Sequence, residues 1–324
     1  MSGIFNILVL GGTGFVGRSL CERLVARLGG AGRITVPSRQ PQRALHLRPL
    51  PIVEIVGADV HDPAQLARLV AGRDAVVNLV AILHGSEAAF NATHAELPRR
   101  LVAACKANSV RRVVHISALG ADANAPSMYL RSKAAGEAVL REAGLDLTML
   151  RPSVIFGEHD RFINLFAAMQ ALAPFVPLAG ADARFQPVWV EDVAAAIVAA
   201  LDAQATIVQT TGQTVECGGP TVYTLRQLVT LAGRWAGHER PVIALPEGAG
   251  RLQARLMELL PGTPLMSRDN IDSMRVPNVL SGALPGLERF GIVPASLESV
   301  MPPLLQRRDG AARFDPWRML ARRN

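Results

Sequence analysis

The sequence predicts an α/β fold, with a doubly wound parallel sheet followed by a smaller, irregular C-terminal lobe. Strand-like and helix-like segments alternate through the first 160 residues, and a glycine-rich loop separates the first strand from the first helix. The hydrophobic share of 49% over 324 residues is enough for a large core. Strands that alternate with helices of this length imply right-handed crossovers and a parallel sheet covered on both faces.

Each element of the first half has its own signal. Short apolar runs that end at glycine or at polar residues indicate buried strands, and these cover residues 5–12, 33–39, 52–60, 74–83, 111–120 and 145–157. Helices are expected at 15–30, 62–72, 92–109 and 127–143. Leu20, Leu24 and Leu28 recur at helical spacing before two glycines, and an aspartate precedes the helix that starts "DPAQL".

After residue 160 the pattern is less regular and prolines cluster, although helices at 190–203 and 224–237 are still expected. We therefore predict a first domain over 1–160, to which residues 187–203 return. Residues 161–324 form the smaller lobe and include a basic tail.

Composition limits the location and the chemistry. We find no apolar run of 18 residues and no signal peptide, so neither a membrane-spanning helix nor export is expected. The three cysteines are too few and too scattered for a disulfide frame or a metal site, and the seven histidines show no ligand spacing. We expect no metal, and a cytoplasmic protein that is either free or peripheral at the inner face of the cytoplasmic membrane.

The net charge of +7 is concentrated at the end of the chain. Residues 301–324 hold two aspartates and six arginines: Arg307, Arg308, Arg313, Arg318, Arg322 and Arg323. One reading is a solvated basic tail. The other is a surface that docks on a membrane or on a partner, because Phe314 and Trp317 lie among the arginines. Nucleic acid is disfavoured, since no platform for stacking bases is visible.

The run "VLGGTGFVG" has the spacing of a phosphate-binding loop. It follows a strand and opens a helix, which is the context that this motif needs. Glycine lets backbone N–H groups approach a pyrophosphate, and the helix N-terminus adds partial positive charge. We therefore predict a dinucleotide site, with a ligand-free turn as the alternative. Its residues are Gly11, Gly12, Thr13, Gly14, Phe15, Val16 and Gly17.

The end of the second strand bears on the choice of cofactor. NAD sites place an acidic residue there for the ribose hydroxyls, whereas "VPSRQPQR" offers Ser38, Arg39 and Arg43. Arginine can bind a 2′-phosphate, so NADP(H) is preferred and NAD(H) stays possible. Arg39 as an ordinary surface residue is the alternative. Asp59 and Val60 are expected on the adenine side, although Asp59 could instead cap the next helix.

Tyr129 and Lys133 are four apart on a predicted helix and share a face. Lys133 is one of only two lysines, against 32 arginines, which favours a site that needs a compact ammonium. A lysine beside a phenol is expected to favour the phenolate, and Ser117 could donate to a substrate carbonyl. The alternative is a surface helix that carries both residues by chance.

At this point the sequence resembles a known family. "GGTGFVG", "YLRSK" and "PVWVEDVAAAI" are similar to the extended, epimerase/dehydratase-type branch of the short-chain dehydrogenase/reductase superfamily. "RPSVIFGEHDRFIN" resembles the atypical members akin to the alpha-subcomplex subunit 9 of respiratory complex I. The resemblance covers about residues 5–235. It implies a Rossmann-type domain, bound NADP(H), and Ser117, Tyr129 and Lys133 as the catalytic trio.

The resemblance also implies further contacts to the cofactor. Asn78, Val80 and Ala81 match the edge of the fourth strand, and Pro152, Ser153 and Val154 match the chain beside the nicotinamide. One departure is the short stretch from Ser117 to Tyr129, because catalytic members usually carry a longer substrate loop there. The resemblance therefore supports binding more than turnover.

Two functions follow, one of an enzyme and one of a non-catalytic protein. The first is a nicotinamide-binding reductase-like protein with weak or undefined oxidoreductase activity, linked to respiratory or quinone metabolism. The second is a non-catalytic accessory or assembly protein of complex I, in which the dinucleotide is structural. Leu252, Leu256, Leu259 and Leu260 support the second if they form an apolar stripe, and an ordinary core helix is the alternative. A sugar-nucleotide epimerase shares the fold but has a longer substrate loop.

Overall fold

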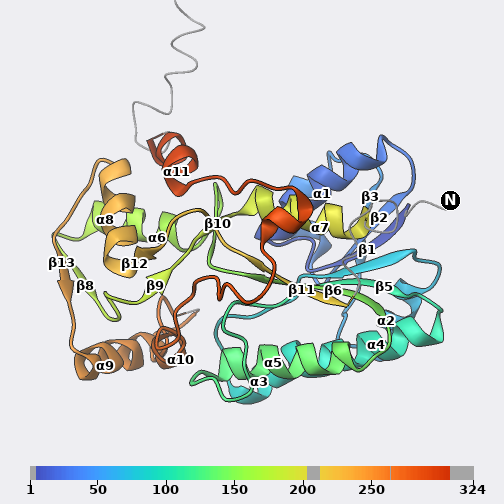
Figure 1. The fold of residues 1–324 in the computed structure, drawn as a ribbon, viewed down its shortest axis with the longest axis horizontal. Coiled ribbons are helices and arrows are strands. Elements are labelled where there is room, and N and C mark those ends of the chain that lie inside the picture. The colour runs from blue at the N-terminus through green and yellow to red at the C-terminus, as the bar shows by residue number, and fades with distance from the viewer. Residues whose placement is uncertain (1–4, 203–211, 263, 307–324) are drawn as a thin grey trace, which may run out of the picture. The chain divides into compact units, whose positions relative to one another are not determined.

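The computed structural model describes residues 5–202, 212–262 and 264–306. The chain forms two compact units (Figure 1). The first unit takes in the segments 1–153, 190–218 and 280–293, and the second takes in 154–189, 219–279 and 294–324. The basic tail with its six arginines falls almost entirely on 307–324, outside the described residues.

A seven-stranded sheet organises the first unit. All its neighbouring strands are parallel, in the order β11-β6-β5-β4-β1-β2-β3. The strands are β1 Asn6–Leu10, β2 Arg33–Ser38, β3 Val53–Gly57, β4 Ala75–Asn78, β5 Arg112–Ile116, β6 Asp146–Pro152 and β11 Gln213–Cys217. Strand order reverses between β1 and β4, which confirms the doubly wound fold and marks the edge where such sheets bind ligands.

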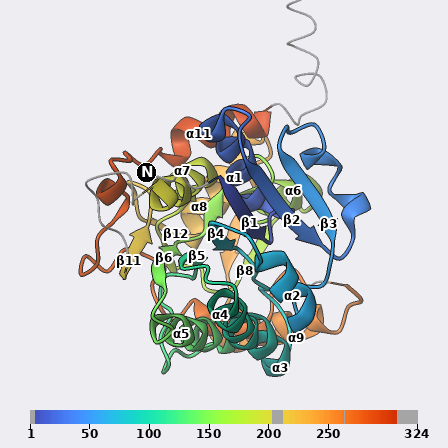
Figure 2. The same ribbon diagram turned by 90° about the vertical axis from the view of Figure 1, so that its right-hand side faces the viewer.

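Helices cover both faces of this sheet (Figure 2). α1 (Phe15–Leu28) and α7 (Val190–Asp202) pack together on one face. The other face carries α2 Pro63–Val70, α3 Glu87–Asn91, the π-helical turn η3 Ala92–Glu96, α4 Leu97–Ala107 and α5 Met128–Arg141. The central strands are buried on both sides, as their continuous apolar runs predict. Short 3₁₀ turns complete the unit at η1 Pro41–Arg43, η2 Leu45–Leu47 and η4 Leu287–Phe290.

Helix caps explain where the helices begin. The Asp62 side chain accepts hydrogen bonds from the Ala64 and Gln65 backbone N–H groups and starts α2. Ser127 accepts from Leu130 N–H and starts α5. The helix expected at 92–109 begins earlier, at Glu87, and contains the π turn before α4.

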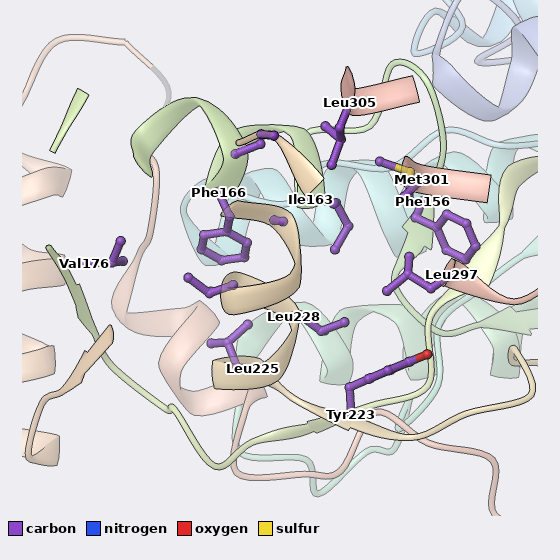
Figure 3. Packing of buried hydrophobic residues seen from close by; sticks show 14 of the residues in the cluster. Phe156, Ile163, Phe166, Val176, Tyr223, Leu225, Leu228, Leu297, Met301 and Leu305 are labelled. Atoms are coloured by element: carbon purple, nitrogen blue, oxygen red, sulfur yellow. The ribbon is translucent and has the colours of Figure 1, made fainter. Parts of the chain in front are cut away.

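The second unit has a separate hydrophobic core. Three helices surround it: α6 Ile163–Leu172, α8 Leu225–Trp235 and α11 Leu297–Gln306. Its buried residues include Phe156, Phe166, Leu228 and Met301, with Leu228 and Ile163 between the two phenylalanines (Figure 3). Three two-stranded sheets complete the unit: β7 Ile155–Phe156 with β10 Val188–Trp189, β8 Val176–Leu178 with β13 Val242–Ala244, and β9 Arg184–Phe185 with β12 Tyr223–Thr224.

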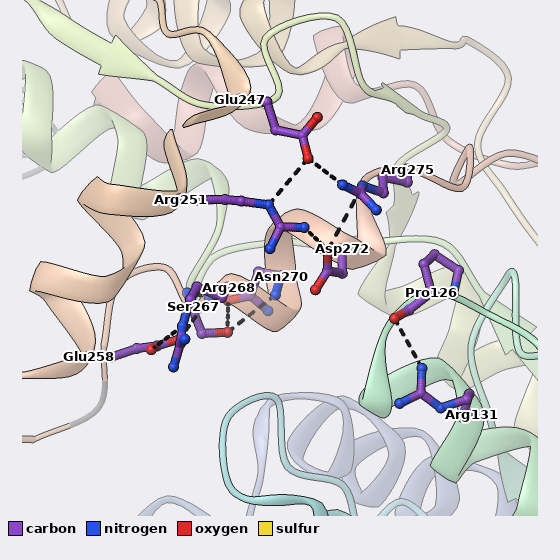
Figure 4. A network of polar contacts seen from close by, with 10 residues as sticks. All are labelled: Pro126, Arg131, Glu247, Arg251, Glu258, Ser267, Arg268, Asn270, Asp272 and Arg275. Atoms are coloured by element: carbon purple, nitrogen blue, oxygen red, sulfur yellow. Dashed lines mark hydrogen bonds and ion pairs between the residues drawn. The ribbon is translucent and has the colours of Figure 1, made fainter. Parts of the chain in front are cut away.

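Helix α9 (Glu247–Glu258) separates its charged and apolar side chains. Arg251 pairs with Glu247 and with Asp272 of α10 (Arg268–Ser273), and Arg275 joins the same network (Figure 4). Leu252 and Leu256, with Leu259 and Leu260 just beyond the helix, are instead 57 to 75% exposed. The alternative of an ordinary core helix is therefore wrong for these leucines, and the apolar stripe lies on the surface of the second unit.

Two further expectations concern the whole chain. Cys21, Cys105 and Cys217 are free and buried, as expected of small core residues, and burial raises the pKa of each thiol. Across residues 5–202, 212–262 and 264–306, no helix combines the length and the apolar character that crossing a bilayer requires.

Candidate functional site

The glycine loop connects β1 to α1 at the point where strand order reverses. Gly11 has φ of +78°, which glycine adopts without strain, and Gly14 N–H donates to the Gly11 carbonyl at 3.0 Å. Gly14 is also the N-cap of α1, and no side chain caps this helix. The first backbone N–H groups of α1 therefore point out of the helix without a side-chain acceptor, which suits an anion such as a pyrophosphate.

The loop has no room for a side chain at Gly17 and is crowded at Gly11. A Cβ on Gly17 would lie 2.4 Å from the Gly12 carbonyl oxygen, so α1 reaches the loop only because Gly17 lacks one. A Cβ on Gly11 would lie 3.1 Å from the Val80 backbone nitrogen. These close backbone approaches are the feature that a dinucleotide-binding loop requires, and the residues present fit that group.

A cleft of about 660 Å³ opens beside this loop. Its lining contains two arginines and no carboxylate, and consists of Gly11, Thr13, Pro37, Ser38, Arg39, Gln40, Arg43, Ala44, Ala58, Val60, His61 and Val80. Arg39 and Arg43 make no ion pair with any residue that the structure describes. The structure thus brings the predicted loop, the end of β2 and the end of β4 to one cleft that favours an anionic ligand.

Asp59 has a different place from the residues around it. Its Oδ1 accepts from His61 N–H at 2.9 Å, and its own N–H donates to Gln65 Oε1. It is not among the lining residues, whereas its neighbours Ala58 and Val60 are. Because Asp62 caps α2, the alternative role of Asp59 as that helix cap is wrong.

The side chain of Asn78, at the end of β4, is engaged within the protein. Its Oδ1 accepts from Val80 N–H at 3.2 Å, which fixes the orientation of the amide. Its Nδ2 then donates to His115 Nδ1 at 3.2 Å. Asn78 therefore shapes the strand end that carries Val80. Ala81 follows on the exposed side of the same segment.

Lys133 extends from α5 to the end of β5. Its Nζ donates to the Ile116 carbonyl at 2.9 Å, next to Ser117, and the side chain is only 2% exposed. Burial lowers the pKa of Lys133 to about 8, while Glu137 acts to raise it. The Ser117 hydroxyl is buried and has no hydrogen-bond partner among the described residues. The ammonium has further donors for a ligand, and Ser117 has a donor of its own.

Tyr129 lies one turn before Lys133, but its environment differs from the one expected. Its ring packs edge-on against His94 at 5.6 Å and against Phe90 at 6.1 Å. Burial raises the pKa of Tyr129 to about 12. Desolvation disfavours the charged form, so the pKa of the phenol is raised and not lowered as the sequence predicted. The phenol keeps its proton at neutral pH.

Two buried histidines next to Lys133 were not singled out by the sequence analysis. Burial and Lys133 lower the pKa of His94 to about 3, and the same causes lower that of His115. Both imidazoles are therefore neutral at neutral pH. Because His115 Nδ1 accepts from Asn78, its proton lies on Nε2, which has no partner among the described residues.

The remaining predicted residues lie where the chain passes from the first unit to the second. Pro152 ends β6, and Ser153 N–H donates to the Cys217 carbonyl within the first unit. Val154 belongs to the second unit, where its N–H donates to Asn278 Oδ1 at 2.9 Å. Within the first unit, the loop and the β2 and β4 ends share the cleft, whereas Ser117, Tyr129 and Lys133 are not among its lining residues.

The doubly wound sheet and the glycine loop at its switch point define a dinucleotide-binding protein of the short-chain dehydrogenase/reductase type. The chain belongs to the NAD dependent epimerase/dehydratase family, which matches residues 7–218. It is similar to subunit 9 of the mitochondrial NADH dehydrogenase [ubiquinone] 1 alpha subcomplex. The subunit of Rattus norvegicus is 31% identical over 310 residues, which are 92% of this chain and 79% of the relative. That of Arabidopsis thaliana is 28% identical over 322 residues, 94% and 79% of the two chains.

Other similar proteins share the fold or part of the chain. A ceramide reductase of Caulobacter vibrioides is 31% identical over 195 residues, 60% of each chain. A dTDP-glucose 4,6-dehydratase from Streptomyces venezuelae, solved with NAD bound, has a TM-score of 0.71 at 21% identity. The match covers 96% of this chain and 99% of that one. At this identity the likeness shows the shared fold.

Proposed function

We propose that the protein binds NADP(H) in the cleft beside the glycine loop and has a weak oxidoreductase activity linked to respiratory or quinone metabolism. The observation that carries the proposal is the cleft itself, where Arg39 and Arg43 stand at the end of β2 and no carboxylate is among the lining residues. A carboxylate there would accept from the ribose hydroxyls of NAD, whereas arginine donates to a 2′-phosphate.

The residues near Lys133 can manage a proton during carbonyl reduction. The bound cofactor would supply or accept a hydride. Tyr129, with a pKa raised by burial to about 12, holds a proton that it can donate. Lys133 can bind the ribose and compensate the phenolate after the proton has left. The unpartnered Ser117 hydroxyl can donate to a carbonyl oxygen. The short stretch from Ser117 to Tyr129 supports only weak turnover.

Replacing Arg39 with alanine is expected to weaken NADPH binding by roughly tenfold to a hundredfold, because a charge-assisted hydrogen bond contributes about 1.5–3 kcal/mol. NADH binding should change little, since NADH has no 2′-phosphate. Fluorescence titration of both nucleotides measures this.

The matched control is Arg48→Ala, which removes an exposed arginine that does not line the cleft. Unchanged NADPH affinity in Arg39→Ala would contradict the 2′-phosphate assignment. Equal losses for NADPH and NADH would show that Arg39 supports the fold of the cleft and not the choice of cofactor.

A second function, an accessory or assembly role at a respiratory complex, is favoured by the exposed leucines of α9. A cluster of large apolar side chains on the surface commonly marks an interaction site. The relatives that match most of this chain are named as subunits of NADH dehydrogenase. In this role the protein would be peripheral at the cytoplasmic face of the membrane, and the bound dinucleotide would be structural.

Native-gel separation of gently solubilised membranes is expected to place the chain with NADH dehydrogenase activity if this second function holds. Glutamate at both Leu256 and Leu259 should release the protein from that band, because charge on an apolar contact is strongly disfavoured. Leu45→Glu, at a leucine 60% exposed in the first unit, is the control and should stay in the band. Recovery of all the wild-type protein in the soluble fraction would contradict the accessory role.

A further inference from the structure

His94 joins three parts of the first unit that the sequence does not link. It lies on the π turn η3 and is 2% exposed. Its Nε2 accepts from Ile82 N–H at 3.1 Å, two residues beyond Val80 of the cleft. Its Nδ1 is 2.8 Å from Ser132 Oγ on α5, and the Ser132 hydroxyl donates to the Tyr129 carbonyl at 2.7 Å.

The hydrogen bonds that link Ile82, His94, Ser132 and Tyr129 all donate in one direction, from Ile82 N–H toward the Tyr129 carbonyl. Because a backbone N–H can only donate, Nε2 of His94 must carry a lone pair, and the proton of the neutral imidazole lies on Nδ1. Nδ1–H then donates to Ser132 Oγ, which leaves the Ser132 hydroxyl proton for the Tyr129 carbonyl. A protonated imidazole could not accept from Ile82, so the bridge requires neutral His94. Burial and the nearby Lys133 lower the pKa of His94 to about 3, which keeps it neutral.

Backbone packing fixes His94 in this place. A Cβ on Gly136 would lie 1.9 Å from the His94 carbonyl oxygen, so α5 and the π turn are in direct backbone contact. π turns are uncommon and often occur at functional sites, because they re-aim one side chain of a helix. Here the turn directs the His94 ring to the Tyr129 ring, with their centroids 5.6 Å apart.

We propose that His94 is a positioning residue that holds the β4 end of the cofactor cleft and the Tyr129 helix in register with each other. This inference rests on the proposed function, since it gives the bridge its purpose at the cofactor site. The ring of His94 shields the Tyr129 phenol from water, and its two nitrogens fix Ile82 and Ser132. Loss of the acceptor nitrogen frees the segment that carries Val80.

The titratable groups around this bridge limit how it can be tested. Lys133 lowers the pKa of His94, Lys133 and His94 lower that of His115, and Glu137 acts on Lys133 from the same helix. None of these is changed in the experiment. Tyr223 is the only other tyrosine of the chain, so Tyr223→Phe makes Tyr129 a single reporter of tyrosinate absorbance.

In the Tyr223→Phe background three substitutions separate the two roles of His94. His94→Ala should lower the pKa of Tyr129 from about 12 toward its ordinary value of 10 and weaken NADPH binding about tenfold. His94→Gln offers an amide oxygen to Ile82 N–H and should recover most of the affinity, while the phenol remains less shielded. Phe90→Leu removes the other ring near Tyr129 and should lower its pKa while NADPH affinity is kept.

The outcomes distinguish this inference from the function on which it rests. Wild-type protein that binds no dinucleotide would overturn the proposed function, while the tyrosine titration of the free protein would still test the shielding by His94. An unchanged titration in His94→Ala would overturn the shielding role. Equal affinity losses in all three variants would make His94 an ordinary core residue. If His94→Ala does not fold, His94→Gln and Phe90→Leu carry the same comparison.

Discussion

Gly17→Ala is expected to raise the dissociation constant for the dinucleotide by roughly a hundredfold, equivalent to about 2.7 kcal/mol, and to lower the free energy of unfolding by about 3 kcal/mol. The new Cβ would lie 2.4 Å from the Gly12 carbonyl oxygen and 2.5 Å from the Gly12 Cα. Both are backbone atoms, so no side-chain rotation relieves the clash. Helix α1 must shift away from the loop, and its first N–H groups then leave the pyrophosphate position.

Gly29→Ala is the matched control for this prediction, because it places the same methyl group at the other end of α1. Gly29 is the C-cap, with φ of +57° and no heavy atom within 4 Å of the added Cβ. Gly29→Ala should lower the free energy of unfolding by about 1 kcal/mol through backbone strain and leave nucleotide affinity unchanged. Denaturant unfolding and nucleotide titration measure both effects. Normal binding by Gly17→Ala would mean that the loop does not hold the cofactor.

Glu137→Gln is expected to lower the free energy of unfolding by about 3 kcal/mol. The substitution breaks the buried ion pair between Glu137 and Arg151 and leaves the Arg151 guanidinium without its counter-ion. The Glu137 side chain is fully buried and accepts two hydrogen bonds from Arg151, at 2.8 and 2.6 Å. This pair joins α5 to β6. The second partner of Glu137 is Arg141, whose side chain is 47% exposed and therefore contributes little to the free energy of unfolding.

The same substitution should reach the site through Lys133. Glu137 acts to raise the pKa of Lys133 against the effect of burial, so Glu137→Gln should move that pKa below about 8. NADPH affinity should then fall more steeply with pH above neutrality than in the wild type. Glu142→Gln, an exposed change at the end of α5, is the control. Stability within about 0.5 kcal/mol of wild type for Glu137→Gln would contradict a structural ion pair.

Local patterns were sufficient to predict six of the seven strands of the main sheet, because each of these strands is rich in apolar residues and is followed by a turn. They were not sufficient for β11. Its sequence, "QTVEC", places a glutamate inside a strand, and the Glu216 side chain is 4% exposed. Glu216 is tolerated because the backbone N–H and hydroxyl of Ser281 donate to its carboxylate, a partner 65 residues away.

The residues of the candidate site also divide into those that local patterns predict and those that they do not. The glycine loop, Arg39 and the Tyr129–Lys133 spacing are signals written within one segment or one helix, and residue order reveals them. His94 and His115 act through contacts between elements: His94 with Ile82 and Ser132, and His115 with Asn78. No spacing rule relates these positions. Tyr129 is desolvated by burial and contacts the rings of Phe90 and His94, which no local spacing places beside it, so the sequence could not anticipate the direction of its pKa shift.

The division of the chain has a consequence for its synthesis. The segments of the two units alternate along the chain, so that 190–218 and 280–293 complete a unit begun at the N-terminus. On the ribosome, the sheet of the first unit cannot gain its β11 edge before residue 217 has emerged. The Glu216 carboxylate then waits for Ser281 before it accepts the hydrogen bonds that make its burial tolerable. The first unit is therefore completed late, and a nascent chain that stops short of residue 217 exposes β6 as an unfinished sheet edge to chaperones or to aggregation.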